Sequence, residues 1–224
     1  MTRFLLAGAC ALALSMPVAQ AAVSTQFDTT SEGWQVVDFN NPNLSLTPQA
    51  SYTPNWLASG GAAGAYIDFH DPSSGSFYFS ASTAYLGDLS SYFGGRLSYA
   101  QQVFAGGGSE WRDNPDLILI GNGQAYVYQH ATNPGSSWQQ FAVTLDGAGW
   151  HRGTLSGATV GASEFQTALG SVSALYVRGE YINGVFETTG LDNVALNPVP
   201  EPETWAMLIA GLGVVAWARR RQAQ

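Results

Sequence analysis

Positive charge is the first thing that this 224-residue sequence lacks. It contains no lysine, and charged residues make up only 11% of the chain. Binding to nucleic acid or to an anionic lipid surface through phosphate groups needs clustered basic side chains. Neither is expected here, because four isolated arginines stand between positions 22 and 197: Arg96, Arg112, Arg152 and Arg178.

Cysteine is nearly absent as well. The single cysteine, Cys10, lies in an apolar N-terminal segment, so the rest of the chain has no disulfide within itself, no catalytic thiol and no thiolate metal ligand. Cys10 has two interpretations, an ordinary residue of a secretory signal or a lipid acceptor. The preceding residues 6–9 resemble a lipoprotein signal out of register, which favours the first interpretation.

The N-terminus has the three parts of a signal peptide. Arg3 supplies the positive start, residues 4–14 form an apolar run, and Ala19-Gln20-Ala21 is a small-x-small cleavage site. The sequence therefore predicts a signal peptide at residues 1–21, which signal peptidase cuts between Ala21 and Ala22. It predicts export across the inner membrane.

The C-terminus has a proline-rich spacer, an apolar segment at residues 204–218, and then Arg219, Arg220 and Arg221. A helix of this length reaches roughly 22 Å, short of the roughly 30 Å hydrocarbon core. Basic residues flanking a membrane helix stay on the cytoplasmic side, so the preceding domain is expected outside. The sequence predicts a single C-terminal apolar helix that anchors the chain before processing.

This tail resembles the PEP-CTERM sorting signal of Gram-negative bacteria that make extracellular polysaccharide. The resemblance covers residues 198–221 and is carried by Val199, Pro200, Glu201 and Pro202, followed by the apolar helix and the basic cluster. It implies cleavage near the motif by an exosortase, transient anchoring, and a final place at the cell surface or in the extracellular matrix. The alternative is a plain short membrane anchor.

The middle of the chain is predicted to be all-β. Its 26 glycines and many aromatic residues suit short strands joined by tight turns. Residues 117–128 contain two apolar runs around Gly121-Asn122-Gly123, a strong hairpin signal. One short helix is expected, with Ser163 as its N-cap and Gly170 at its end. Strands at regular spacing favour a β-sandwich of the jelly-roll kind.

A second resemblance extends over residues 27–196 and gives the expected domain at residues 22–197. Its segments, in chain order, are residues 27–34, 78–81, 86–90, 94–99, 116–121, 175–181 and 190–194. Together they resemble the laminin IV (laminin B) domain. The resemblance implies a galactose-binding-like jelly roll used in extracellular matrix, with no catalytic role to carry over. The cysteine-rich repeats that flank the laminin module are missing from this chain.

Two tryptophans in glycine-rich surroundings, Trp111 and Trp150, are candidates for stacking on sugar rings, because an exposed aromatic face removes the apolar side of a sugar from water. Core packing is the alternative for each. Trp34, just after the first turn, is expected in the core.

Calcium is the one cofactor that the sequence suggests. First and last strands often lie side by side in jelly rolls, so Asp28 and Asp192 are candidate calcium ligands, with Glu32 and Asn193 as additional ones. The alternative is that these acids cap turns.

No catalytic motif is present, which favours a non-catalytic module associated with glycan, extracellular polysaccharide or biofilm. The alternative is a polysaccharide-active hydrolase or lyase delivered by the same signal. It predicts paired carboxylates with perturbed pKa values in a cleft.

Overall fold

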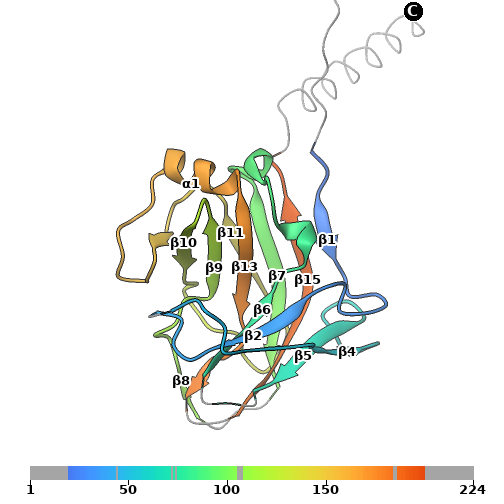
Figure 1. Cartoon of the computed structure of the whole chain (residues 1–224). Helices are drawn as coiled ribbons and strands as arrows, with labels where there is room; N and C mark the ends of the chain where they lie inside the picture. Colours follow the sequence, from blue (N-terminus) through green and yellow to red (C-terminus); the bar gives the residue numbers. More distant parts are fainter. Residues whose placement is uncertain are drawn as a thin grey trace, which may run out of the picture.

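The structure is a computed structural model that describes residues 20–199, except 44, 72, 74, 105–107 and 184–185. Within these residues the chain forms two antiparallel sheets that pack face to face (Figure 1). Residues 1–19 of the predicted signal peptide and the apolar helix at 204–218 lie outside the described residues. No helix among the described residues has the length and apolar character needed to cross a bilayer.

The first sheet has six strands in the order β11-β7-β15-β5-β4, and β1 pairs with the far end of β15. Its strands are β1 (Val23–Thr25), β4 (Asn55–Leu57), β5 (Tyr66–His70), β7 (Arg96–Val103), β11 (Gln139–Thr144) and β15 (Thr188–Asn197). The pairing of Val23 with Leu196 places the first strand beside the last, as expected. A β-bulge interrupts β15 between Asp192 and Ala195, where Asn193 has a positive φ of 50°.

The second sheet has seven strands in the order β12-β10-β9-β13-β6-β2-β3. Its strands are β2 (Gln35–Phe39), β3 (Ala50–Tyr52), β6 (Ser76–Ser80), β9 (Leu117–Gly121), β10 (Gln124–Tyr128), β12 (His151–Arg152) and β13 (Val172–Arg178). Two short strands, β8 (Ser109–Glu110) and β14 (Ile182–Asn183), pair at the end of the sandwich opposite the helix (Figure 1). Two 3-10 turns, Thr83–Tyr85 and Ser90–Tyr92, precede β7.

Alternation along the strands explains the two apolar clusters. On β9, Leu117 and Leu119 face the main core between the sheets, whereas Ile118 faces a smaller cluster on the outer side of the seven-stranded sheet. Burial on both faces is why this strand is a continuous apolar run. Loop residues Leu46 and Leu155 pack against the outer cluster.

The hairpin prediction is confirmed. Gly121 pairs with Gln124, so Asn122 and Gly123 form a two-residue turn with φ values of 51° and 72°. Both φ values are positive, as a type I′ turn requires, and Asn-Gly is the dipeptide that adopts this geometry most readily.

The helix α1 (Ala162–Leu169) covers one end of the sandwich (Figure 1). It buries Phe165, Ala168 and Leu169, and Gly170 is its C-cap, as predicted. The predicted N-cap is wrong: Gly161 occupies that position, and Ser163 lies inside the first turn. The expected class, an all-β jelly-roll sandwich with one short helix, is confirmed.

Candidate functional site

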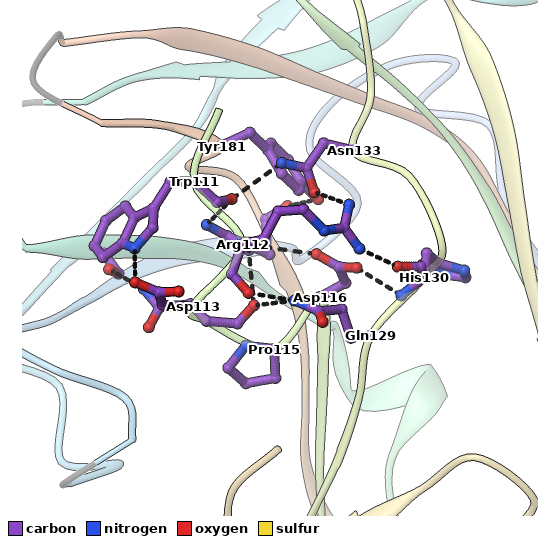
Figure 2. Close-up of polar contacts among 12 residues, drawn as sticks. Trp111, Arg112, Asp113, Pro115, Asp116, Gln129, His130, Asn133 and Tyr181 are labelled. Atoms are coloured by element: carbon purple, nitrogen blue, oxygen red, sulfur yellow. Dashed lines mark hydrogen bonds and ion pairs between the residues drawn. The ribbon is translucent and has the colours of Figure 1, made fainter. Parts of the chain in front are cut away.

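The loop at residues 111–116 joins β8 to β9, and each of its main-chain carbonyls accepts a hydrogen bond. The Asp113 carbonyl accepts from Asn43 Nδ2 at 3.1 Å and the Pro115 carbonyl from the Tyr78 hydroxyl at 2.8 Å. The Arg112 carbonyl accepts from Gln129 Nε2 (Figure 2). Since backbone polar groups are rarely all satisfied in an exposed loop without regular structure, this loop is held in one conformation.

Arg178, at the end of β13, supplies the donors for the other three carbonyls. Its Nη2 donates to the Trp111 carbonyl and its Nη1 to the Asn114 carbonyl, both at 2.9 Å, and its main-chain N–H donates to the Asp116 carbonyl. The guanidinium is fully buried and lies 3.6 Å from Asp116 Oδ1. It also lies 4.9 Å from the centre of the Tyr181 ring. A buried cation is tolerated only when it is hydrogen-bonded and paired. Nη1 and Nη2 are hydrogen-bonded and Nη1 faces Asp116, whereas Nε has no partner among the described residues.

His130 packs behind the loop in its neutral form. Its main-chain N–H donates to Asp116 Oδ2 at 2.7 Å, and its ring Nε2 shares a hydrogen bond of 3.0 Å with the Tyr99 hydroxyl. Burial, followed by the nearby positive charge of Arg112, lowers the pKa of His130 to about 4. Arg112 extends toward His130 and Asn133, on the side of the loop away from Trp111 (Figure 2).

A pocket of about 390 Å³ lies beside this loop. Its walls come from three loops, and the lining residues are Asn43, Arg112, Asp113, Thr154, Leu155 and Ser156. Because Leu155 packs on the outer apolar cluster, the pocket lies over the outer face of the seven-stranded sheet. The Trp111 indole N–H donates to Asp113 Oδ2 at 3.3 Å, which places the indole next to the pocket wall (Figure 2).

The family model for laminin B (domain IV) matches residues 78–203, more than half of the chain. The chain belongs to the laminin B family. The solved L4b domain of human laminin alpha-2 is similar to this chain, with a TM-score of 0.63 and 16% identity, over 81% of this chain and 98% of that one. A search of curated proteins finds no match.

Two further solved structures are similar to the laminin B protein at lower scores. The family 11 carbohydrate-binding module of a cellulosomal cellulase from Clostridium thermocellum has a TM-score of 0.44 and 15% identity, over 84% of this chain and 92% of that one. The CBM22-1 xylan-binding domain of Xyn10C from Paenibacillus barcinonensis has a TM-score of 0.46 and 13% identity, over 82% and 99%.

The PEP-CTERM protein-sorting motif matches residues 198–222 of the laminin B protein. The match begins directly after β15, which ends at Asn197, and includes Val199, Pro200, Glu201 and Pro202. It indicates export, processing by an exosortase and sorting to the cell surface of a Gram-negative bacterium.

The two candidate stacking residues of the laminin B protein have different environments. Trp111 is partly exposed beside the pocket. Trp150 is fully buried, with its ring 4.8 Å from that of Phe165 and 5.5 Å from that of Tyr128, so its prediction as a sugar-stacking residue is wrong. Trp34 is fully buried in the core, as expected.

The predicted calcium ligands meet at the edge where β1 lies beside β15. Asp192 is fully buried and accepts N–H groups from Ala63 at 3.1 Å and Asn193 at 2.6 Å. Burial raises its pKa, and the nearby charge of Asp28 raises it further, so the two carboxylates lie within electrostatic range. The described residues contain no group of three or more His, Cys, Asp or Glu side chains placed to hold a metal. Calcium binding stays a prediction that rests on two carboxylates.

Sequence reasoning counted Arg178 among four isolated arginines and missed the loop that it organises. The available signal was a lone arginine in the apolar strand Leu175-Tyr176-Val177-Arg178, because a buried cation requires several acceptors. The pocket residues Asn43, Thr154 and Ser156 carried no local signal, since they belong to loops that meet only in the folded protein.

Proposed function

We propose that this protein is a non-catalytic module of the extracellular matrix that binds polysaccharide in the pocket between residues 41–49, 111–116 and 153–157. The observation that carries the proposal is a pocket whose lining side chains are polar except Leu155, with the partly exposed Trp111 indole bonded to its lining residue Asp113, on a loop whose carbonyls are all hydrogen-bonded. The sorting motif supports a destination among surface polysaccharides, and a role in biofilm organisation follows from that destination.

The chemistry of the pocket suits a sugar. Thr154 and Ser156 carry hydroxyls, Asn43 an amide and Asp113 a carboxylate, which complement the hydroxyl groups of a carbohydrate. The Leu155 side chain and the Trp111 indole supply the apolar surface that a sugar ring needs. A loop that is already held in place avoids most of the ordering cost of binding.

Affinity electrophoresis of the full chain in mild detergent, against gels containing a panel of neutral and acidic bacterial polysaccharides, tests this proposal. Ser156→Trp fills the pocket from an exposed position and is expected to abolish retardation by the polysaccharide that binds. The matched control, Ser163→Trp, places the same bulk on the exposed side of α1 and is expected to bind like the wild type. Equal binding by Ser156→Trp, or no retardation by any polymer, would contradict the proposal.

Binding is favoured over the hydrolase or lyase alternative because of where the acidic pairs lie. Glu180 and Glu187 have pKa values raised to about 8 and about 7, as a catalytic pair might. Their side chains are only 5% and 0% exposed, and neither lines the pocket. The Glu187 carboxylate is also occupied by two main-chain N–H groups of its own loop.

We also propose that Asp28 and Asp192 hold a calcium ion that ties β1 to β15. Carboxylate oxygens are ligands that calcium prefers, and ion binding would relieve the repulsion that Asp28 exerts on Asp192. Calcium is expected to raise the melting temperature of the full chain by several degrees, and a chelator to reverse the rise. Identical melting curves with calcium and with chelator would remove this proposal.

A further inference from the structure

Four buried carboxyls lie at the end of the sandwich opposite α1. We call Asp38, Asp71, Glu180 and Glu187 the carboxyl cluster; they are 1%, 2%, 5% and 0% exposed. They come from β2, from the segment after β5, from the segment after β13, and from the residue before β15. The neighbouring cation is Arg178, whose guanidinium is already committed to the loop carbonyls and Asp116.

Three members of the carboxyl cluster have hydrogen-bond donors. Glu187 accepts the main-chain N–H groups of Tyr181 and Ile182, each at 2.6 Å. Asp71 accepts the Ser73 N–H at 3.0 Å, and Asp38 accepts the Ser73 hydroxyl at 2.6 Å. These hydrogen bonds hold two segments beside the carboxyl cluster in place, one at Ser73 and one at residues 181–182.

Glu180 is the member with least support. The nearby Ser76 hydroxyl lowers its pKa, whereas its Oε2 has no partner among the residues that the structure describes. A buried carboxylate oxygen without a donor costs free energy, and the protonated form avoids most of that cost. Burial, and then the charges of Asp71 and Glu187, raise the pKa of Glu180 to about 8, against the opposing effects of Ser76 and Arg178.

Other ionisable groups around Glu180 add little positive charge. Tyr78 packs near it from β6, and burial raises the pKa of that phenol far above its usual value. Asp71 in turn faces Asp38 and His70. Ionising Glu180 therefore adds a negative charge to a site that already contains three other carboxyls. The one nearby cation, Arg178, is already bonded to the loop carbonyls and faces Asp116.

Ser76 lies beside Glu180, and hydrogen bonds join Ser76 to the pocket. The Ser76 hydroxyl accepts from Asn114 Nδ2 at 2.7 Å. Asn114 Oδ1 accepts from Asn43 Nδ2 at 2.9 Å, and Asn43 lines the pocket. A parallel connection runs through the backbone, because the Trp111 N–H donates to the Tyr181 carbonyl at 2.7 Å.

We propose that loss of the Glu180 proton opens the carboxyl cluster and loosens the loop at residues 111–116, here called the pocket loop. The module then releases polysaccharide as its surroundings become alkaline. The release step rests on the proposed function, whereas the opening step does not. The driving force is repulsion from Asp71 and Glu187, and the route to the pocket is the Glu180–Ser76–Asn114–Asn43 chain.

The sign follows from linkage. The closed form holds a proton on Glu180 that an open form, with the ordinary pKa of 4.5, has lost above that pH. Closure is therefore fully favoured below pH 4.5 and weakens as pH rises through about 8, by up to about tenfold per pH unit for one proton. Above about pH 8 the opening constant becomes flat.

Hydrogen exchange of the full chain without polysaccharide tests the opening step. Protection factors, corrected for the intrinsic exchange rate, are followed for the N–H groups of Trp111, Tyr181 and Ile182 between pH 5.5 and pH 8.5. In the wild type they are expected to fall on the order of tenfold per pH unit and to flatten near pH 8. The Val172 N–H, which donates to the Gly87 carbonyl at 2.8 Å shortly after α1, is the internal control.

Glu180→Gln keeps the shape of the side chain without its ionisation and is expected to flatten the pH dependence between about pH 7 and pH 8, while the dependence below pH 7 that belongs to Glu187, with its pKa of about 7, persists. Ser76→Ala leaves Glu180 ionisable, so the protection factor of the Tyr181 N–H is expected to stay pH-dependent. The protection factor of the Asn43 N–H, followed in the same experiment, is expected to lose its pH dependence. Equal slopes in the wild type and Glu180→Gln, or a wild type with no slope, would overturn the proposal. Because no ligand is present, such a result is independent of the Ser156→Trp binding test.

Discussion

The two ends of the sandwich are closed by different chemistry. At the α1 end, Phe165, Ala168 and Leu169 fill the space between the sheets, and Trp150 packs against Phe165. At the opposite end, Arg178, Asp116 and the carboxyl cluster are buried. Hydrogen bonds from Arg178 hold the pocket loop. Apolar packing is non-directional, whereas a buried polar network specifies one geometry and responds to protons. The loop at residues 111–116 lies at the end where geometry is specified.

Removing the organising cation is expected to give the largest effect on this comparison. Arg178→Met leaves Asp116 buried without its ion-pair partner and removes the guanidinium donors of the Trp111 and Asn114 carbonyls, which keep only the side-chain amides of Asn133 and Gln129. The expected loss in free energy of unfolding is about 4 kcal/mol, measured by urea denaturation. Arg178→Lys keeps the charge but cannot bridge both carbonyls, so its free energy of unfolding should lie between those of the wild type and Arg178→Met. A loss below about 1 kcal/mol for Arg178→Met would show that the network is not needed for stability.

The corresponding change at the apolar end is Phe165→Ala. It leaves a cavity next to Trp150 and is expected to cost about 3 kcal/mol in the same denaturation experiment. Polysaccharide binding at a temperature where the variant is folded should be unchanged, because no pocket residue touches α1's buried face. Loss of binding in the folded variant would show that the two ends are coupled.

The pH dependence of stability sharpens the comparison at a smaller scale. Glu180 and Glu187 keep protons in the folded state up to about pH 8 and about pH 7, against an ordinary pKa of 4.5, so their contribution is complete below pH 4.5 and is lost as pH rises through 7–8. His130, with a pKa of about 4 against 6.5, contributes stability that is lost as pH falls from 6.5. The melting temperature at pH 6 is expected to exceed that at pH 8 by several degrees, in the wild type and in Phe165→Ala alike. A melting temperature that rises between pH 6 and pH 8 would contradict the conclusion that Glu180 and Glu187 hold protons in the folded state over this range.

The smallest effect is expected for the ion pair on the surface of α1. Arg152 Nη2 lies 2.8 Å from Glu164 Oε1, but their side chains are 48% and 30% exposed. Arg152→Ala is expected to cost about 0.5 kcal/mol, and added salt should reduce even that difference. A cost close to that of Arg178→Met would mean that burial does not separate the two arginines.

Local sequence was sufficient where the physics is local. The Asn122-Gly123 turn follows from the ease with which these residues adopt positive φ, and strand β9 follows from an apolar run between turn signals. Helix α1 was found from its apolar spacing, but its N-terminus was misplaced, because Gly161 starts the helix with no side-chain cap. The sorting motif could be recognised because it is a linear signal that needs no folded partner.

Burial and long-range contact were decided by tertiary structure. Trp111 and Trp150 have similar local sequences, yet the packing of α1 encloses Trp150 and leaves Trp111 partly exposed. Arg178 reaches a carbonyl 64 residues away in sequence, a pairing that no local pattern encodes. The sequence by itself determined which residues alternate, turn and are exported. Only the fold decided which polar groups lost their water, because that depends on what the rest of the chain places against them.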